Sequence, residues 1–382
     1  MGPVKTRIIL ASRDMSWFRD GPSLSTAARG AAAALARRIG LDTHRAAEVA
    51  LAVTEAATNI QRHATDGALL LRTLHTDDEA AVEFVTVDSG PGMVDVSASL
   101  ADGASSAGTL GIGLGAVVRL ADHFDVHSVP GKGTVMAAQF WSRQADDQGV
   151  TAALSAGRQG VSGVTRPISG EITCGDAWSA RLDTDVDTGA DRDADTGAQT
   201  GAETGTGAST ATGSDRPAVL VMMCDGLGHG PLAARASAAA VEAFHDTPAT
   251  DPEDIMRAIH RALRGTRGGA AAVARIEPAA LRVRYCGIGN ISGFLIGHDA
   301  RTTLLSVPGI VGVNMRRLRT FEAPLPEGGA LAMHSDGLTE RWDHTALPGL
   351  LHHSPLVMAG QLLREAGVRR DDASVVVVKG VW

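Results

Sequence analysis

The sequence predicts a protein of two domains, each of which combines α-helices with β-strands. A chain of 382 residues has room for two or three domains of ordinary size. Segments with helical periodicity and strand-like apolar runs occur in both halves, and a short polar stretch, RQADDQG at 143–149, follows the apolar strand VMAAQFW. We therefore place one domain at 1–143, a linker at 144–149 and a second domain at 150–382.

The composition indicates a globular protein and excludes several classes. Hydrophobic residues make up 44% of the chain and aromatic residues 3%, so the cores depend on small aliphatic side chains. No apolar run reaches the roughly 18 residues that span a bilayer, and the N-terminus lacks the apolar core of a signal peptide. Cys174, Cys224 and Cys286 are too scattered for a disulfide framework. We expect a cytoplasmic protein that does not contact a membrane.

The negative charge is concentrated in one segment. The net charge is −8, and Asp183–Asp215 holds eight acidic residues against Arg192 alone, which leaves −1 for the rest of the chain. The segment has almost no large apolar side chain to offset its ordering entropy, so we predict a disordered insertion at 183–215, between two strands of a folded region. It is either a plain solvated insertion or a regulatory loop. Clustered Lys and Arg, which a nucleic-acid surface requires, are missing from the sequence.

The first half contains a helix with two polar residues suited to a metal ion. Residues Thr43–Ala64 show helical periodicity, and Glu55 and Asn59, four positions apart, project from one helical face. A carboxylate and an amide on one face can serve a hydrated magnesium ion, which prefers oxygen ligands. Taken alone, the pair is better explained as a solvent-facing Glu–Asn pair, so a metal-binding role depends on the segments that follow.

Three glycine-containing segments follow this helix. The strand Ala81–Val87 ends in Asp88 and the sequence Ser-Gly-Pro-Gly, which offers a buried carboxylate beside backbone that a flat ring can approach. Residues GTLGIGLG at 108–115 precede a helix expected at Ala116–Asp122, where backbone N–H groups and the helix dipole attract phosphates. A tight turn, GKGT, leads into the last strand. In this order the four segments indicate a magnesium–ATP site.

Across roughly 3–141 the sequence resembles the GHKL (Bergerat) ATP-binding fold, and within it the anti-sigma serine kinases of the RsbT and RsbW type. The phrases TEAATNIQRHA, VDSGPGM, GTLGIGLGAVVRLAD and GKGT carry the resemblance. It implies an α/β sandwich with helices layered on a mixed sheet. It also implies that Glu55 is the general base or orients the nucleophile, that Asn59 binds magnesium and that Asp88 accepts from the adenine amino group. The remaining nucleotide contacts would be Gly90, Gly92, Thr134 and a phosphate lid of Gly111, Gly113 and Gly115.

In the second half, acidic residues recur at the ends of apolar strands. Asp225 and Asp336 each follow a strongly apolar run and precede a glycine, Asp176 follows Cys174 and Gly175 in a strand-like segment, and Asp371 precedes the last strand. A sheet would bring these four sites together, and such a cluster of oxygen ligands suits two divalent cations. A single aspartate at a strand end is often only a turn former. Gly226 has no side chain, so its carbonyl can approach a metal directly. Water is the expected nucleophile, since no cysteine or serine stands in a nucleophile setting.

From about 150 to 381 the sequence resembles the SpoIIE-type branch of the metal-dependent (PPM) protein phosphatases, in its short RsbX-type form. The phrases CGDAW, VMMCDGLGHG, RGGAAAVARI, YCGIGNISGFLI, HSDGLTER and RDDASVVVV carry this resemblance. It implies a β-sandwich flanked by helices, including 231–244 and 251–264. It further implies that Asp225 bridges two manganese or magnesium ions, that the Gly226 carbonyl is a ligand, that Asp336 and Asp371 complete one site, and that Asp176 supports the other.

The sequence departs from the family pattern at three points. Cys174 replaces a glycine of the first acidic box, and we expect the change to be tolerated. Leu227 stands where many relatives carry a proton-donating histidine, which leaves the general acid open, with His229 as a candidate. Asp372 either ligates a metal or caps the chain locally, and we prefer Asp371 as the ligand.

The two resemblances together imply a bifunctional partner-switching regulator. The first domain would phosphorylate a serine or threonine of a STAS-type (anti-anti-sigma) or stressosome-type protein, and the second would remove the phosphate. An alternative keeps only the phosphatase as an enzyme and makes the first domain a nucleotide-dependent binding or sensing module. A kinase with a degenerate phosphatase is a weaker alternative, because all the expected carboxylates are present. The oligomeric state is not predicted.

Overall fold

The first half forms a two-layer unit of helices on a sheet. The computed structural model describes residues 7–76, 79–100, 113–142, 160–183, 217–315, 317–342, 347–368 and 370–382. Strands β1 (Arg7–Arg19), β2 (Ala68–His75), β3 (Ala80–Val87), β5 (Gly133–Trp141) and β4 (His123–Val129) lie side by side in that order. All their pairings in the described residues are antiparallel, which corrects the expected mixed sheet.

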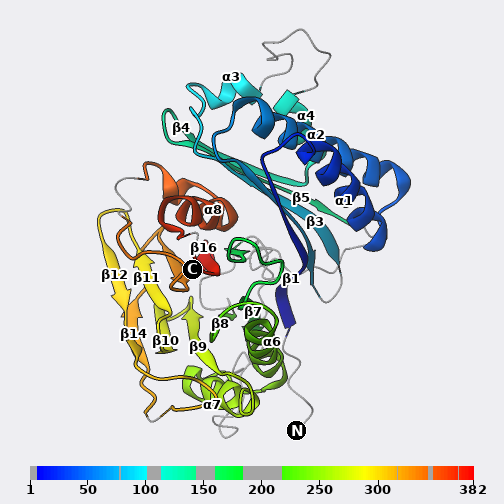
Figure 1. Cartoon of the computed structure of the whole chain (residues 1–382). Helices are drawn as coiled ribbons and strands as arrows, with labels where there is room; N and C mark the ends of the chain where they lie inside the picture. Colours follow the sequence, from blue (N-terminus) through cyan, green and yellow to red (C-terminus); the bar gives the residue numbers. More distant parts are fainter. Residues whose placement is uncertain are drawn as a thin grey trace, which may run out of the picture.

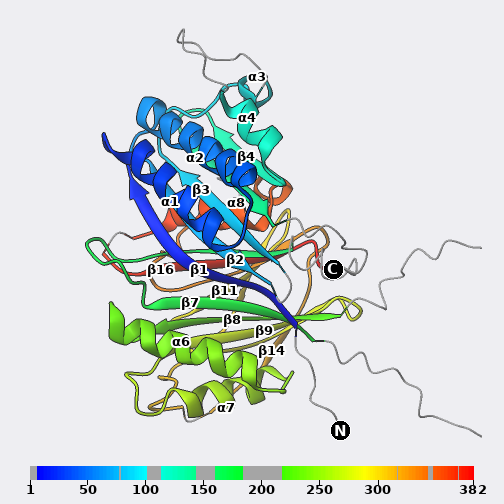
Figure 2. The same cartoon turned by 90° about the vertical axis from the view of Figure 1, so that its right-hand side faces the viewer.

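Two long helices cover one face of this sheet (Figure 2). Helix α1 (Leu24–Arg38) and helix α2 (Thr43–His63) bury alanine-rich stripes against it, and the Asp42 side chain caps α2 by accepting from the Arg45 N–H. A stripe of small residues lets these helices approach the sheet closely while the opposite side of α2 remains polar. Two shorter helices, α3 (Val96–Leu100) and α4 (Gly113–Leu120), lie at the α2 side of the unit.

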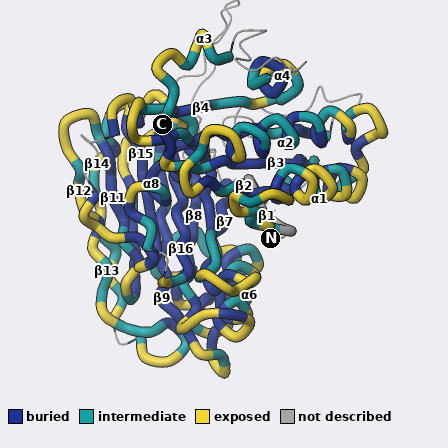
Figure 3. Tube along the Cα trace, turned by 45° about the horizontal axis from the view of Figure 1, so that its top comes forward, coloured by how far each residue is buried: buried dark blue, intermediate teal, exposed yellow. Residues whose placement is uncertain are grey.

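The second half is a β-sandwich flanked by helices, as expected. One sheet has the order β13-β10-β9-β8-β7, with β14 also paired to β10, and the other has the order β12-β11-β15-β16-β6. Helices α6 (Pro231–Asp246) and α7 (Pro252–Ala262) cover the outer face of β8 and β9. Figure 3 shows the central strands buried along their length. The strands are β6 (Val161–Arg166), β7 (Asp176–Asp183), β8 (Ala218–Gly226), β9 (Gly269–Glu277), β10 (Arg282–Ile288), β11 (Ser292–Ile296), β12 (Arg301–Leu304), β13 (Ser306–Val307), β14 (Phe321–Pro324), β15 (Ala330–His334) and β16 (Ala373–Lys379).

The two halves share one continuous sheet, which the sequence did not predict. The C-terminal part of β1 pairs with β2, whereas its first residues pair antiparallel with β7 of the sandwich. An 11-stranded sheet therefore runs from β13 to β4 through both halves. Since β1 belongs to the sheets of both units, residues 1–143 do not form a sheet separate from the second half.

Helix α8 (Pro355–Ala366) lies between the two halves (Figure 1). One side packs on β6 and β16 of the sandwich, and the other packs on β3, β4 and β5 of the first half. Nearly every residue of the helix is buried, which explains its sequence, PLVMAGQLLREA, with apolar residues on all sides. The resulting core joins Leu70, Val85 and Val135 of the first sheet to Val164 and Val375 of the second.

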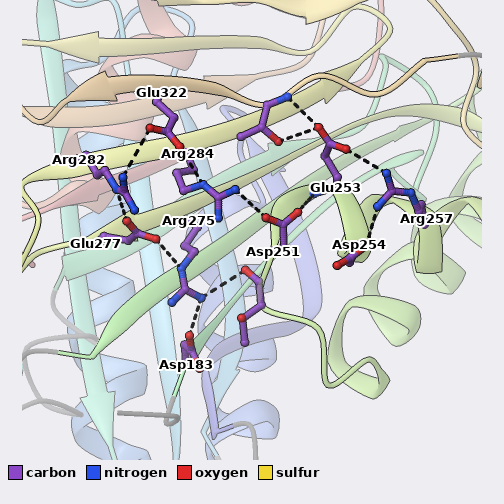
Figure 4. A network of polar contacts seen from close by, with 12 residues as sticks. Asp183, Asp251, Glu253, Asp254, Arg257, Arg275, Glu277, Arg282, Arg284 and Glu322 are labelled. Atoms are coloured by element: carbon purple, nitrogen blue, oxygen red, sulfur yellow. Dashed lines mark hydrogen bonds and ion pairs between the residues drawn. The ribbon is translucent and has the colours of Figure 1, made fainter. Parts of the chain in front are cut away.

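Charged residues tie α7 to the outer sheet (Figure 4). Asp251 caps α7 by accepting from the Glu253 N–H at 2.9 Å, and the same carboxylate binds Arg284 of β10 at 2.6 Å. Arg275 of β9 binds Glu277 and also Asp183, the buried last residue of β7.

Asp183 is thus part of a strand, which corrects the predicted start of the insertion at residue 183. The rest of the predicted insertion and the predicted linker at 144–149 lie outside the described residues. Within the described chain, every helix is too short or too polar to cross a membrane.

Candidate functional site

Two antiparallel strands set the core of the acidic cluster in the second half. The register of β7 and β8 places Asp176 directly opposite Asp225. The Asp225 carboxyl group lies close enough to those of both Asp176 and Asp336 to shift their pKa values. Three of the four predicted acidic sites therefore meet at one edge of the sandwich, with Asp225 in the central position.

The second sheet supplies Asp336 together with two groups that orient the cluster. Asp336 follows β15, and Asn290 donates from Nδ2 to its Oδ2 atom at 2.6 Å. Ser335 donates from Oγ to Asp176 Oδ2 at 2.6 Å, and the same hydroxyl accepts from the Ser374 N–H. Sequence reasoning missed both orienting residues, although Asn290 follows an apolar strand, as Asp225 and Asp336 do.

The two neighbouring aspartates before β16 have different surroundings. Asp372 is buried, and its two oxygens accept from the Ile168 and Gly175 N–H groups, each at 2.7 Å. Asp371 is half-buried, accepts from the Asp372 N–H, and is close enough to Asp225 and Asp336 to raise the pKa of both. Asp372 therefore fixes the loops around the cluster, and Asp371 stays the predicted ligand.

The electrostatics of the carboxylate cluster favour the binding of cations at this edge of the sandwich. Burial raises the pKa of Asp176, Asp225 and Asp336, and repulsion from neighbouring carboxylates, those of Asp371 and Asp372 included, raises each value further. Carboxylates that are buried together in this way are stabilised in their charged form by a bound divalent cation, whose preferred ligands are oxygens. The donor set of the cluster thus fits the predicted metal ions.

Gly226 and Cys174, two residues next to the cluster, have structural surroundings that the sequence did not predict. A Cβ atom on Gly226 would lie 2.2 Å from the Ala233 carbonyl oxygen, so close packing against α6 already requires glycine there. Cys174 lies with Asp176 and Asp372 in a group whose potential ligand atoms are within 4.8 Å of one another. Burial raises the pKa of the Cys174 thiol, and the Asp372 oxygens are already occupied by backbone donors, so this group is less suited to a metal than the Asp225 cluster.

The predicted magnesium residues of the first half lie on α2 as expected. Glu55 and Asn59 are both half-buried on this helix. The Asn59 Nδ2 atom is buried and has no hydrogen-bond partner among the described residues. A buried amide donor without a partner is costly, and a bound nucleotide–metal complex is a group that would satisfy it.

Asp88 and the glycines after it form a tightly packed corner at the end of β3. Burial raises the pKa of Asp88, although its Oδ1 atom accepts from the Gly90 N–H at 2.8 Å. Cβ atoms on Gly90 and Gly92 would lie 2.8 Å and 2.3 Å from the carbonyl oxygens of His63 and Val129. Thr134 accepts from the Asp88 N–H through its carbonyl oxygen. The structure therefore brings these four predicted residues together.

The predicted phosphate lid is only partly described. Helix α4 begins at Gly113, three residues before the expected start, so Gly115 lies in its first turn. Gly113 has a positive φ of 63°, a conformation that favours glycine, and Gly115 is buried. Gly111 lies outside the described residues. The lid role of these glycines stays a prediction.

The fold and the two sites define a class of protein in which a nucleotide-binding α/β domain is joined to a metal-dependent hydrolase sandwich. Comparison with known families specifies both parts. The family of the histidine kinase-like ATPase domain matches residues 19–139, and the family of stage II sporulation protein E (SpoIIE) matches residues 215–380. The chain belongs to the histidine kinase-like ATPase family through its first half and carries a SpoIIE phosphatase domain in its second.

Individual relatives match the two halves separately. The serine/threonine-protein kinase RsbT of Bacillus subtilis (strain 168) is 34% identical over 117 residues, which are 31% of this chain and 88% of RsbT. The phosphoserine phosphatase RsbX of the same organism is 26% identical over 126 residues, which are 33% of this chain and 63% of RsbX. The crystal structure of RsbX in complex with magnesium matches with a TM-score of 0.44 and 20% identity, over 57% of this chain and 94% of that one. ATP, magnesium and divalent cations are the cofactors of these two domain types.

Proposed function

We propose that the chain is a partner-switching regulator that controls the phosphorylation of serine or threonine on a partner protein. The second half hydrolyses the phosphate ester with two divalent cations, manganese or magnesium. The first half binds magnesium–ATP and transfers the γ-phosphoryl group to the same class of protein. The proposed partners are STAS-domain anti-anti-sigma or stressosome-type proteins, which the sequence resemblance supports. A cytoplasmic setting is supported by three free, buried cysteines.

The observation that carries the phosphatase proposal is the meeting of Asp176, Asp225 and Asp336 at one edge of the sandwich. We assign Asp225 as the bridging ligand and Asp336 with Asp371 to one metal. Asp176 would support the other metal, and the Gly226 carbonyl would contribute a further oxygen. Two divalent ions held there polarise a phosphate and lower the pKa of an attacking water. Ser335 and Asn290 hold the carboxylates of Asp176 and Asp336 in place by hydrogen bonds.

The nucleotide proposal depends on the unpartnered Asn59 amide together with Asp88. Asn59 would hold magnesium, Glu55 would take the proton from the substrate hydroxyl, and Asp88 would bind the adenine amino group. Gly90, Gly92 and Thr134 would line the nucleotide, and Gly111, Gly113 and Gly115 would form the lid over its phosphates. The second candidate, a nucleotide-dependent binding module, uses the same contacts without phosphoryl transfer.

The phosphatase is tested by hydrolysis of a synthetic phosphoserine peptide in the presence of Mn²⁺. Asp225→Asn and Asp336→Asn are expected to lower kcat/KM by a factor of about 100 or more, since both residues would hold the metals. Asp299→Asn, which changes an exposed aspartate elsewhere in the same domain, is the control and should match the wild type. Undiminished hydrolysis in both cluster variants would show that the reaction does not use these carboxylates.

The kinase is tested with ATP labelled in the γ-phosphate and a set of purified STAS-domain proteins. The wild type should transfer label to one of them, and Asn59→Ala should lose both nucleotide binding and transfer. If the wild type binds ATP but labels none of the proteins, the binding-module function replaces the kinase. Phosphatase-deficient Asp225→Asn protein is the suitable background, because it does not remove the label that it adds.

A further inference from the structure

Exposed apolar side chains gather on the loops around the carboxylate cluster. Of the eight large hydrophobic residues that the described chain leaves exposed, four lie next to this cluster, three of them on its loops and one in the first turn of α6. They are Ile172 at 91% exposure, Val313 at 62%, and Leu227 and Leu232 at 50% each. Single exposed apolar residues are normal on a protein surface, but a cluster of them next to an active site marks a contact surface.

Contacts between neighbouring residues show that the segments carrying these four side chains lie side by side. The Leu227 N–H donates to the Gly268 carbonyl at 3.0 Å, and a Cβ atom on Gly268 would lie 3.0 Å from Val313 Cγ2. On the other side, a Cβ atom on Gly230 would lie 3.6 Å from Glu171 Oε1. Ile172 follows Glu171, and Leu232 follows Gly230 by two residues. The surface therefore surrounds the loop that begins at Asp225.

Arg267 adds a cation to this surface. Its side chain is exposed, and its Nη1 atom would lie 3.2 Å from a Cβ atom on Gly228, in the same loop as Asp225. No ion pair holds this guanidinium within the described part of the chain, unlike Arg275 and Arg284 of the same domain. A guanidinium can bind two oxygens of a phosphate at once, and one without an ion-pair partner among the described residues, next to the carboxylate cluster, is placed to do so.

We propose that these four apolar residues and Arg267 form the docking surface for a phosphoprotein whose phosphoserine or phosphothreonine is flanked by apolar side chains. The proposal rests on the phosphatase function of the same site. Arg267 contacts the phosphate, and the apolar residues contact the side chains on either side of it. The ligand is a protein segment rather than a small phosphate ester, because a small hydrophilic ester offers no apolar surface to cover this rim.

The test compares three substrates in the presence of Mn²⁺. They are p-nitrophenyl phosphate and two synthetic phosphoserine peptides of equal length, one with leucine and valine around the phosphoserine and one with serine in their place. The wild type should cleave the apolar peptide with the higher kcat/KM. Ile172→Ser, Leu232→Ser and Val313→Ser should each lower kcat/KM for that peptide about 3- to 10-fold, the effect of losing partial burial of one aliphatic side chain. Their activity on the other two substrates should be unchanged.

Two further variants serve as control and complement. Leu281→Ser removes a residue of similar exposure from the turn before β10, and it should leave all three rates unchanged. Arg267→Ala should raise KM for both peptides, and Arg267→Lys should restore part of the loss because it keeps the charge without the bidentate geometry.

Several outcomes would overturn the docking surface. The first is that the wild type cleaves the two peptides with equal kcat/KM. The second is that the serine variants lose as much kcat/KM on p-nitrophenyl phosphate as on the apolar peptide. The third is that those variants change their oligomeric state without a change in peptide kinetics. The last result would assign the surface to contacts between copies of the chain. A wild type that fails to cleave p-nitrophenyl phosphate with Mn²⁺ would instead reject the phosphatase function itself, so the two failures are distinguishable.

Discussion

His353 Nδ1 lies 2.9 Å from Asp125 Oδ1, although 228 residues separate the two in the sequence. The other oxygen of Asp125 accepts from the Ser354 N–H at 2.6 Å, and Ser354 is the N-cap residue of α8. A carboxylate of the first half thus binds at the positive end of a helix that belongs to the second. The two halves are joined by this contact as well as by the apolar surfaces on both sides of α8.

The Asp125 contact predicts a pH-dependent contribution to stability. Burial would raise the pKa of Asp125, but hydrogen bonds from His353 and Ser354 outweigh burial and lower it. A lowered folded-state pKa means that the charged group stabilises the protein at neutral pH and that this stabilisation is lost as the pH falls through the folded-state value. Asp125→Asn should therefore lower the free energy of unfolding by about 1.5–3 kcal/mol at pH 7.

Urea denaturation of the wild type and Asp125→Asn at several pH values between 7 and 3 measures this contribution. The difference in midpoint should be constant near neutrality and should shrink below the ordinary pKa of an aspartate, about 4. Asp95→Asn, which changes an exposed aspartate of the first half, is the comparison variant. A difference that stayed constant down to pH 3 would mean that the Asp125 charge does not contribute.

Arg72 and Glu83 form a fully buried ion pair within the sheet of the first half. They lie opposite each other on β2 and β3, with Arg72 Nε donating to Glu83 Oε1 at 2.6 Å. Arg72→Met leaves Glu83 buried without its partner and should cost about 3–5 kcal/mol, whereas Arg72→Met combined with Glu83→Leu should recover most of that loss. Denaturant melts of the two variants measure the difference. A double variant as unstable as the single one would show that the pair itself contributes net stability.

The meeting of Asp176 and Asp225 could be predicted from the sequence because its signal is local. An aspartate after an apolar strand and before a glycine is visible without any structure, and the β7–β8 pairing then places Asp176 opposite Asp225. Asn290 and Ser335 were missed because their importance depends on which side chains face them across the sandwich. Hydrogen bonds of that kind depend on tertiary pairing, which leaves no periodic signal along the chain.

The joining of the two halves was not predictable for a related reason. The strand β1 is long enough to pair with two partners, but only the register shows that its first residues reach β7. Helix α8 reads as an apolar segment, and a helix that is apolar on all sides predicts burial without saying between which layers. Each of the two family resemblances implied a separate fold for its own half of the chain. A sheet shared by both halves was therefore not expected.

Helix α8 packs closely on β5 of the first half at Gly360. A Cβ atom there would lie 2.7 Å from Val135 Cγ1 on β5, and a buried valine has little freedom to move. Gly360→Ala should therefore destabilise the protein by about 1–3 kcal/mol through overpacking, despite the better helix propensity of alanine. Adding Val135→Ala should relieve the clash, so the double variant should be more stable than the sum of the two single changes predicts.

A second helical glycine provides the control for that experiment. Gly30 of α1 is exposed, and a Cβ atom there would meet nothing within 4 Å. Gly30→Ala should stabilise the protein by about 0.5–1 kcal/mol, the ordinary gain in a helix interior. If Gly360→Ala stabilised the protein by a similar amount, α8 would have to be less tightly packed on β5 than its contacts indicate.

Metal binding should stabilise the folded protein through the same carboxylates that repel one another without it. Asp225 is half-buried, and burial together with repulsion from Asp176 and Asp336 raises its pKa, so Asp225→Asn removes a group that is costly in the folded state and should raise the melting temperature of the metal-free protein. In the wild type, Mn²⁺ at a hundred times its Kd should add about 2.7 kcal/mol of stability. Asp225→Asn should lose that increase along with phosphatase activity, whereas Asp299→Asn should keep both. Differential scanning calorimetry with EDTA and with Mn²⁺ measures the two effects, and an Asp225→Asn protein that gained as much stability from Mn²⁺ as the wild type would place the metal elsewhere.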